Sequence, residues 1–145
     1  MSDVYEADFY AWTKGQADAL RRRAANEIDW DNLAEEIDYL GNSHENEIEA
    51  RLENLLLHLL KWNYQPESQC GSWRSSIREV RYRIARLIKK NPSLRAYPSD
   101  YLGEAYSAAR PRALDETGLV ALPDACPWTI DDVLAEDFLP SRLSF

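Results

Sequence analysis

Residues Asn32–Gln65, NLAEEIDYLGNSHENEIEARLENLLLHLLKWNYQ, have the clearest helical pattern in the chain. Apolar residues recur in this stretch at gaps of three or four positions, or twice four, and form one stripe: Leu33, Ile37, Leu40, Ile48, Leu52, Leu55, Leu59 and Trp62. Such spacing is typical of one face of an α-helix. It predicts a long helix of about nine turns. A single face of this helix should be buried, and its Leu-rich end should be central in the fold.

Gly41-Asn42-Ser43 is the weak point of this helix, because glycine costs about 1 kcal/mol relative to alanine in a helix interior. The apolar stripe nevertheless keeps its phase across the glycine, since Leu40 and Ile48 lie on the same side. We therefore favour one continuous helix over two separate ones, with a kink at the glycine as the alternative.

Further helices are expected before and after this segment. The first should run from about Glu6 to Arg23, and Asp29 is a suitable N-cap for the long helix. Residues 65–71 are polar and rich in breakers, which indicates a loop. After it, Ser72 should cap a strongly amphipathic helix that ends at Asn91-Pro92.

The last third of the chain predicts one longer and one shorter helix. Tyr97-Pro98-Ser99-Asp100 should open the longer one, which Pro111 is expected to kink or split. Gly118 is a natural C-cap, and an irregular crossing segment should follow it. Thr129, with Asp132 three residues on, should begin a short helix through about Glu136.

These elements predict an all-α protein, built as an antiparallel helical bundle of about four main helices with a short C-terminal helix. No strand alternation or internal repeat is present in the sequence. A length of 145 residues favours a single domain, residues 1–145, because two domains of ordinary size would need a longer chain. We expect a core over 5–140 and a loose tail over 141–145.

Composition narrows the classes of function. The net charge is −8, which opposes non-specific adhesion to nucleic acid or to an anionic membrane. The N-terminus has no basic region followed by an apolar one, so we expect no secretory leader and a cytoplasmic protein. Cys70 and Cys126 stand apart in the sequence and are interpreted as two free thiols rather than a disulfide.

The charges are unevenly placed along the chain. Residues 34–53 carry seven acids and one base, whereas residues 73–90 carry seven bases and one acid. Arg74, Arg78 and Arg81 fall on one flank of the basic helix and could follow phosphates. The competing interpretation, which the sequence favours, is an internal charge match between the acidic and the basic helix.

Neither a metal centre nor a cofactor site is predicted. Helical bundles with two-metal sites use Glu-x-x-His motifs, but Gly41 stands three residues before His44 and Leu55 three residues before His58. His44 with Glu47 could supply only two ligands. The aromatic residues at helical spacing are interpreted as core, and Trp62-Asn63-Tyr64-Gln65 beside Ser72-Trp73-Arg74 is where a cleft is expected.

Several strings resemble a bacterial family known as domain of unknown function family twenty-nine (DUF29). They are Tyr5–Trp12, Asp29–Ile37, His58–Glu67, Ser72–Arg74, Asn91–Leu94, Glu116–Leu119 and Phe138–Pro140. The resemblance runs from about Tyr5 to Pro140, and Pro111 departs from the uninterrupted helix usual in the family. It implies a small helical protein with no assigned activity, cofactor or catalytic residue.

The preferred hypothesis for function is a cytoplasmic protein-interaction or regulatory module, which binds an unknown protein partner or associates with itself. Its candidate interaction residues are Arg74, Arg78, Arg81, Trp62, Tyr64 and Trp73. One alternative is an enzyme in which His58 acts as acid or base, with Glu35, Glu36 or Arg74 as polar neighbours. The other is nucleic-acid binding through the basic helix 73–90.

Overall fold

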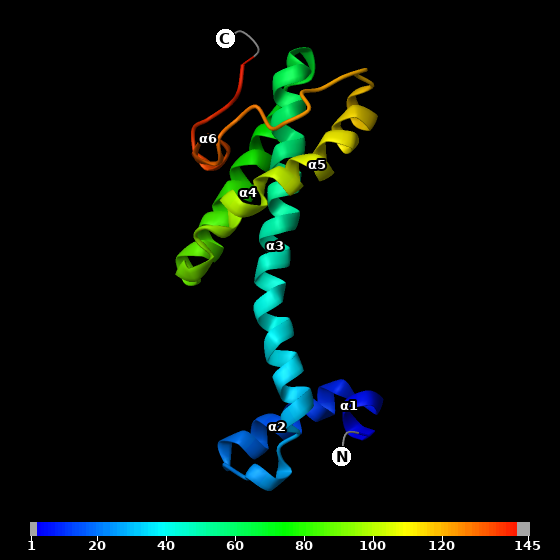
Figure 1. Ribbon diagram of the computed structural model, residues 1–145, viewed down its shortest axis with the longest axis vertical. Helices are drawn as coiled ribbons and strands as arrows, with labels where there is room; N and C mark the ends of the chain where they lie inside the picture. The colour runs from blue at the N-terminus through cyan, green and yellow to red at the C-terminus, as the bar shows by residue number, and fades with distance from the viewer. Residues whose placement is uncertain (1–2, 142–145) are drawn as a thin grey trace. The chain divides into compact units, whose positions relative to one another are not determined.

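The structure, a computed structural model, describes residues 3–141 (Figure 1). Its α-helices are α1 (Asp3–Ala7), α2 (Phe9–Arg21), α3 (Trp30–Tyr64), α4 (Gly71–Lys90), α5 (Tyr97–Thr117) and α6 (Ile130–Leu134). Short 3-10 turns lie at Ala25–Glu27, Pro66–Ser68 and Pro92–Leu94. Regular structure in this range is entirely helical, so the prediction of an all-α fold is confirmed. The tail expected after Pro140 lies almost wholly outside the described residues.

The chain packs as two compact units, residues 1–43 and residues 44–145. Helix α3 contributes its first turns to the first unit and its remaining turns to the second. It continues without interruption through Gly41, which confirms the prediction of one continuous helix. The assignment of a single domain stays a prediction.

The first unit is held together by aromatic packing and by one partly buried acid. The rings of Tyr5, Phe9 and Trp12 lie with centroids 4.8 to 5.7 Å apart. Trp12 is buried, and its indole Nε1 donates to Asp29 Oδ2 at 3.1 Å. The Asn32 side chain also donates to this oxygen, and this bond is the main reason why the pKa of Asp29 lies below its usual range. Asp29 directly precedes α3, as the sequence predicts.

The single first helix expected from Glu6 to Arg23 is wrong, because the structure divides it at Asp8. Asp8 has the non-helical φ of −152°, and its carboxylate accepts from the Ala11 backbone N–H at 3.0 Å. A short acidic side chain that bonds to the backbone in this way competes with helix continuation and starts a new helix.

The second unit contains the hydrophobic core. Its buried side chains come from α3, α4, α5 and α6, and the largest contribution is made by α3: Leu52, Leu55, Leu56, Leu57, Leu59, Leu60 and Trp62. Leu57 lies opposite the predicted stripe, yet it is as buried as Leu55. Burial on opposite sides of this part of α3 means that neighbouring elements cover most of its circumference. The central position expected for the Leu-rich end is therefore confirmed.

The expectation that one face of α3 is buried along its whole length is wrong for the first half. Ile48 is fully buried, but Leu33 is only half-buried, and Ile37 and Leu40 are 60% and 61% exposed. The period of the stripe is unbroken, so the difference lies in what covers it. The turns after Ile48 belong to the larger unit with its core, whereas the first turns lack such a layer.

The observed ends of α4 and α5 agree in part with the ends predicted from the sequence. Helix α4 begins at Gly71, with Cys70 at the N-cap position, so the cap expected at Ser72 is wrong because Ser72 is already helical. Helix α5 runs through Pro111 without being split. Gly118 has a φ of 73°, a left-handed conformation that favours glycine, and its N–H donates to Leu114 O. The predicted C-cap is thus confirmed.

The segment after Gly118 crosses α5 as an irregular chain that side chains hold in place. Tyr106 is buried, and its hydroxyl donates to Pro123 O at 2.6 Å. The Arg110 guanidinium donates to the carbonyls of Leu122 and Pro123. The Thr129 side chain then accepts from the Asp132 N–H and caps α6, which ends at Leu134, two residues before the predicted Glu136.

Two tyrosines of α5 pair with two acids of α3. The hydroxyl of Tyr97 donates to Glu49, and that of Tyr101 donates to Glu53 at 2.7 Å. These bonds join residues 48 positions apart and anchor α5 on the acidic side of α3. The bond to Glu53 raises the pKa of Tyr101 from 10.0 to about 12, because ionisation would place two negative charges side by side.

Replacing Tyr101 by phenylalanine should lower the free energy of unfolding near neutral pH by about 1 kcal/mol. A tyrosine whose pKa is raised on folding stabilises the folded state below the unfolded pKa of 10.0 and loses this contribution as the pH rises toward about 12. The Tyr101→Phe variant should therefore lose less stability between neutral pH and pH 11 than the wild type, as measured by urea unfolding. Tyr39→Phe, at an exposed ring, is the control and should behave as the wild type.

Candidate functional site

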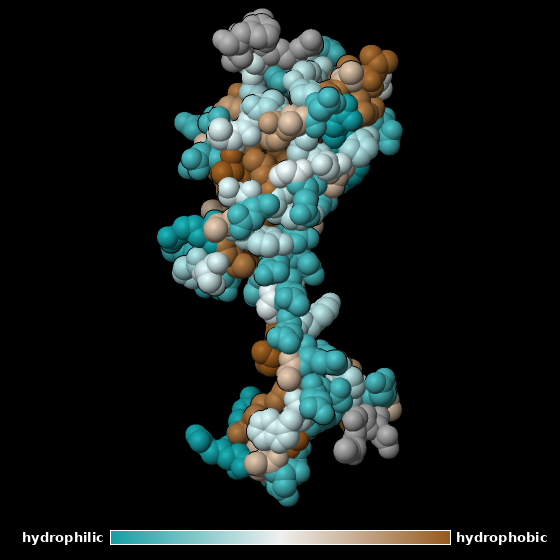
Figure 2. Space-filling model, viewed as in Figure 1, coloured by the Kyte–Doolittle hydropathy of each residue, from teal (hydrophilic) through white to brown (hydrophobic). Residues whose placement is uncertain are grey.

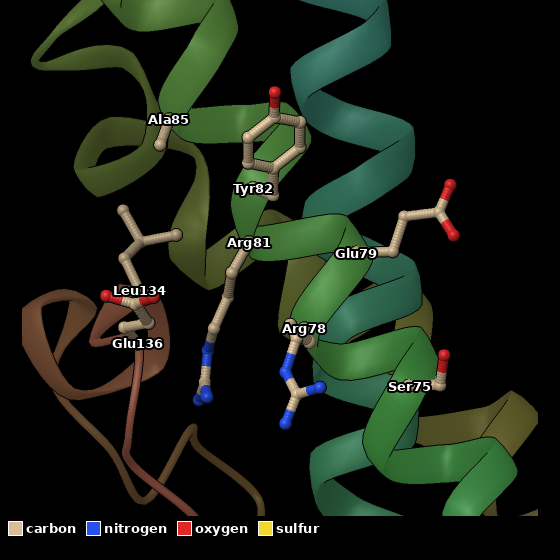
Figure 3. Close-up of a pocket in the computed structure, with 8 residues that line it drawn as sticks. All are labelled: Ser75, Arg78, Glu79, Arg81, Tyr82, Ala85, Leu134 and Glu136. Carbon is tan, nitrogen blue, oxygen red and sulfur yellow. The ribbon is translucent and has the colours of Figure 1, made fainter.

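The most distinctive polar feature of the second unit lies along α4. Ile77, Val80 and Ile84 bury the apolar face of this helix. Arg74, Arg78 and Arg81 follow one another at spacings of four and three, so their Cβ atoms lie within about 60 degrees of arc. Figure 3 shows the side chains of Arg78 and Arg81 extending in the same direction from α4, beside the segment that carries Leu134 and Glu136.

Arg81 is the buried charge of this group. Only 6% of its surface is exposed, and its Nε donates to Val133 O in α6 at 2.8 Å. Its Nη2 is buried and has no hydrogen-bond partner. Burial lowers the pKa of the Arg81 guanidinium, while the nearby Asp137 carboxylate acts in the opposite direction. The guanidinium still carries its charge at neutral pH.

A groove of about 660 Å³ opens beside Arg81. Its walls combine charged side chains with apolar surface, and the residues that define it include Arg78, Arg81, Tyr82, Ala85, Leu134 and Glu136 (Figure 3). Two neighbouring hollows of about 450 and 460 Å³ also have Arg81 in their walls, one extending toward Lys89 and Arg95 and the other toward Arg74 and Asp137. Arg81 therefore lies where three concavities meet.

The bases of α4 do not neutralise the acids of α3, so the internal charge match favoured by the sequence is wrong. Among residues 3–141, no ion pair within 4.0 Å joins these two helices. Glu47 pairs with Arg51 of its own helix, and the acids further along bond to the α5 tyrosines. Within α4, Arg83 pairs with Glu79 at 3.4 Å. The arginines around the groove thus keep their charge available.

The residues proposed for an enzyme are not gathered in one unit. Glu35 and Glu36 belong to the first unit, whereas His58 and Arg74 belong to the second. Glu36 accepts from the Tyr5 hydroxyl at 2.6 Å. His58 Nδ1 lies 2.9 Å from Asn54 O, and because a carbonyl can only accept, this ring nitrogen donates. His58 thus has the backbone partner common for a helix histidine, and the enzyme stays a hypothesis.

The aromatic residues expected at a cleft are brought together in part. Trp62 is buried, and the Arg74 guanidinium lies 5.3 Å from its ring centre. Lys61 Nζ lies 5.0 Å from the Trp73 ring in the same way. Tyr64 is half-buried at the end of α3 and packs against the core. These cation–π contacts join α3 to the start of α4.

The sequence did not identify Leu134, Glu136 and Asp137 as neighbours of the basic helix. They lie more than 50 positions after Arg81, in and after a helix of five residues. No motif links the two segments, and a helix so short has too little periodicity to indicate which face it presents. The only signal was the charge of α4, which identified Arg74, Arg78 and Arg81 but not what lies opposite them.

A second candidate surface lies in the first unit. Its large apolar side chains are unusually exposed: Val4, Phe9, Tyr10, Leu20, Trp30, Ile37, Tyr39 and Leu40. Three of them, Trp30, Ile37 and Leu40, share one face of α3 with the half-buried Leu33, and we call these four residues the apolar stripe of α3. Figure 2 shows hydrophobic surface among polar residues around the first turns of α3.

Within residues 3–141, no three His, Cys, Asp or Glu side chains are close enough to hold a metal ion together. Each helix in this range is too short or too polar to span a lipid bilayer. Cys70 and Cys126 are both free thiols, and burial raises the pKa of Cys126.

Comparison with known proteins identifies the family. The sequence profile of the family described as Domain of unknown function DUF29 matches residues 4–139. Because the match covers nearly the whole chain, the chain belongs to this family, and the resemblance seen in the sequence is confirmed. No curated protein and no solved structure matched the chain.

Proposed function

We propose that this member of the DUF29 family is a cytoplasmic protein-interaction module whose apolar stripe of α3 binds a helix of a partner protein. The partner helix is apolar on one face and carries lysine or arginine along the edges of that face. This is the common mode in which an amphipathic helix binds through residues spaced one helical turn apart.

The observation that carries the proposal is the exposure of the stripe. Trp30, Ile37 and Leu40 are 60 to 61% exposed although they continue the same face that is fully buried from Ile48 onward. Isolated exposed apolar residues are ordinary, but several on consecutive turns of one helix form a patch that is typical of interaction sites. Exposed aromatic residues such as Trp30 are enriched at the centres of interfaces.

Charge around the stripe indicates the chemistry of the partner. Residues 1–43 contain ten acids and four bases, a net formal charge of −6. Asp31, Glu35 and Asp38 are exposed along one flank of the stripe. Two copies of this surface would repel each other, whereas a basic partner would be attracted and oriented. The proposal therefore commits to a basic partner rather than to a second copy of the chain.

The experiment uses two helical model peptides of equal hydrophobicity, one built from leucine and lysine and the other from leucine and glutamate. Fluorescence anisotropy with the full-length protein should detect binding of the basic peptide and not of the acidic one. The double variant Ile37→Ala, Leu40→Ala should bind the basic peptide at least about tenfold more weakly, equivalent to about 1.4 kcal/mol. Alanine keeps the helix intact, so the fold should be unchanged.

Val120→Ala is the matched control, because Val120 is fully exposed in the other unit. It should bind as the wild type does. Equal binding of both peptides, or unchanged binding by the double variant, would contradict the proposal. So would a homodimer in ultracentrifugation that becomes monomeric in the double variant, since the stripe would then belong to a second copy.

A further inference from the structure

The groove beside Arg81 is independent of the apolar stripe and belongs to the other unit. From its geometry we propose that it binds a small organic molecule that has a single carboxylate and an apolar body. Arg81 and Arg78 hold the carboxylate, and the apolar wall formed by Tyr82, Ala85 and Leu134 contacts the body of the ligand.

The buried guanidinium of Arg81 has a donor without an acceptor. Arg81 is 94% buried with one hydrogen bond, from Nε to Val133 O, while the buried Nη2 has no partner. A buried polar group without a hydrogen-bond partner is destabilising, and the penalty is larger for a charged group. Such groups are rare in folded proteins unless they serve a ligand or a reaction. Arg81 therefore has donor capacity that no acceptor within residues 3–141 uses, on a side chain that lines the groove.

The position of this guanidinium suits the binding of an anion. It lies where three concavities meet, with Arg78 parallel to it on the preceding turn (Figure 3). The fork of an arginine matches the two oxygens of a carboxylate, and a second guanidinium beside it adds further donors. Arg81 is also oriented in advance by its bond to Val133 O, so little side-chain entropy is lost when an anion binds.

Charge in the groove favours a carboxylate over a more highly charged ligand. The groove is lined by Arg78 and Arg81 and by Glu79 and Glu136, and Glu79 pairs with Arg83, which leaves an excess of one positive charge. Glu136 and Asp137 also line the neighbouring hollow beside Arg81. A carboxylate supplies one negative charge, whereas a phosphate monoester carries about 1.5 to 2 and would be repelled by the two acids. The same acids oppose the backbone of a nucleic acid, which presents one charge per phosphate.

The apolar part of the groove suits the body of the ligand. The groove has a volume of about 660 Å³, within the range of sites that hold small molecules. Tyr82, Ala85 and Leu134 present carbon surface in the same groove as the two arginines. Apolar walls with a few polar groups at one end are the usual arrangement for an amphiphilic ligand. An aliphatic or aromatic acid fits this division.

The test uses 3-phenylpropionate as the probe and 3-phenylpropanamide as its uncharged counterpart. Nuclear magnetic resonance of the full-length protein can follow the Nε–Hε signal of Arg81 during titration. We expect the carboxylate to shift this signal and to bind at least about tenfold more tightly than the amide, the ratio expected for a charge-assisted bond. Equal affinity for both compounds, or no shift of the Arg81 signal with either, would overturn the proposal.

Variants separate the role of Arg81 from a general effect of charge. Arg81→Met keeps the size of the side chain and should abolish the preference for the carboxylate over the amide. Lys90→Met removes an exposed base of the same helix that lines none of these hollows, and it should bind the probe as the wild type does. If Arg81→Met is not folded, Arg78→Met serves the same purpose, because Arg78 is exposed and should lower affinity severalfold. Unchanged affinity in the folded variants would contradict the assignment.

Two further measurements distinguish the proposed carboxylate from Asp137 and from a phosphate as the partner of Arg81. Asp137→Asn should strengthen binding of the probe severalfold, because it removes the acid that competes for Arg81. If this variant instead lowers the melting temperature and leaves affinity unchanged, Asp137 is the partner of Arg81 and no ligand is needed. Displacement of the probe by inorganic phosphate or by a single-stranded oligonucleotide at physiological salt would assign the groove to phosphate and overturn the choice of a carboxylate.

Discussion

Replacing Leu56 by alanine should lower the free energy of unfolding by about 2 to 5 kcal/mol, the range measured for large apolar side chains truncated in well-packed cores. Leu56 is fully buried in the part of α3 that contributes most to the core. The surrounding helices cannot all move inward to fill the space, so both the transfer energy and the cavity contribute. Because a domain of this size has only about 5 to 15 kcal/mol of stability, the loss should be a large fraction of the total.

The measurement is urea unfolding followed by far-ultraviolet circular dichroism. Leu40→Ala, in the same helix, is the matched control, because Leu40 is 61% exposed. Surface substitutions of this kind change stability by less than about 0.5 kcal/mol. Equal losses in the two variants would mean that the two halves of α3 are buried alike. That result would also remove the basis of the proposed interaction surface.

Replacing Ala109 by leucine should lower the free energy of unfolding by about 1 to 3 kcal/mol. Ala105, Ala109 and Ala113 are fully buried and spaced four residues apart, so they form a line of small side chains where α5 packs on the core. A leucine at the central position adds three carbon atoms to a contact that has no free volume. Neighbouring side chains must leave their preferred rotamers, or α5 must shift away from α3.

Ser107→Leu is the control for this prediction, because Ser107 is exposed in the same helix and the added side chain is identical. Its effect should remain within about 0.5 kcal/mol. A stable Ala109→Leu variant would mean that α5 lies less closely on the core than the structure indicates. The displacement should also weaken the bonds of Tyr97 and Tyr101 to the acids of α3, since these lie on the same helix.

The two proposed sites are flanked by side chains of opposite charge. The first unit presents apolar side chains flanked by acids, and the second presents a groove flanked by arginines. This division follows from the pairing of α3 with the tyrosines of α5 rather than with α4. A tyrosine hydroxyl satisfies a carboxylate without adding a positive charge, so the arginines of α4 are left for another partner.

The positions of the helices could be predicted from the sequence because the signals for them are local. The period of the apolar residues, Gly118 as a C-cap and Asn91-Pro92 as a stop are each read within a few turns of chain. The errors near Asp8 and Ser72 have the same origin, since a cap is decided by a single hydrogen bond that several neighbouring polar residues could make. The candidate site could be predicted only in part, from the spacing of Arg74, Arg78 and Arg81.

Periodicity along one segment was enough to predict that the chain is helical, that α3 is continuous through Gly41, and that the Leu-rich end of α3 is central. The exposure of Ile37 and Leu40, and the bond between Arg81 and Val133, 52 positions away, became visible only in the folded chain. An apolar stripe shows which face of a helix avoids water but not which element covers it. That choice depends on contacts between distant segments, and these contacts leave no pattern in the local sequence.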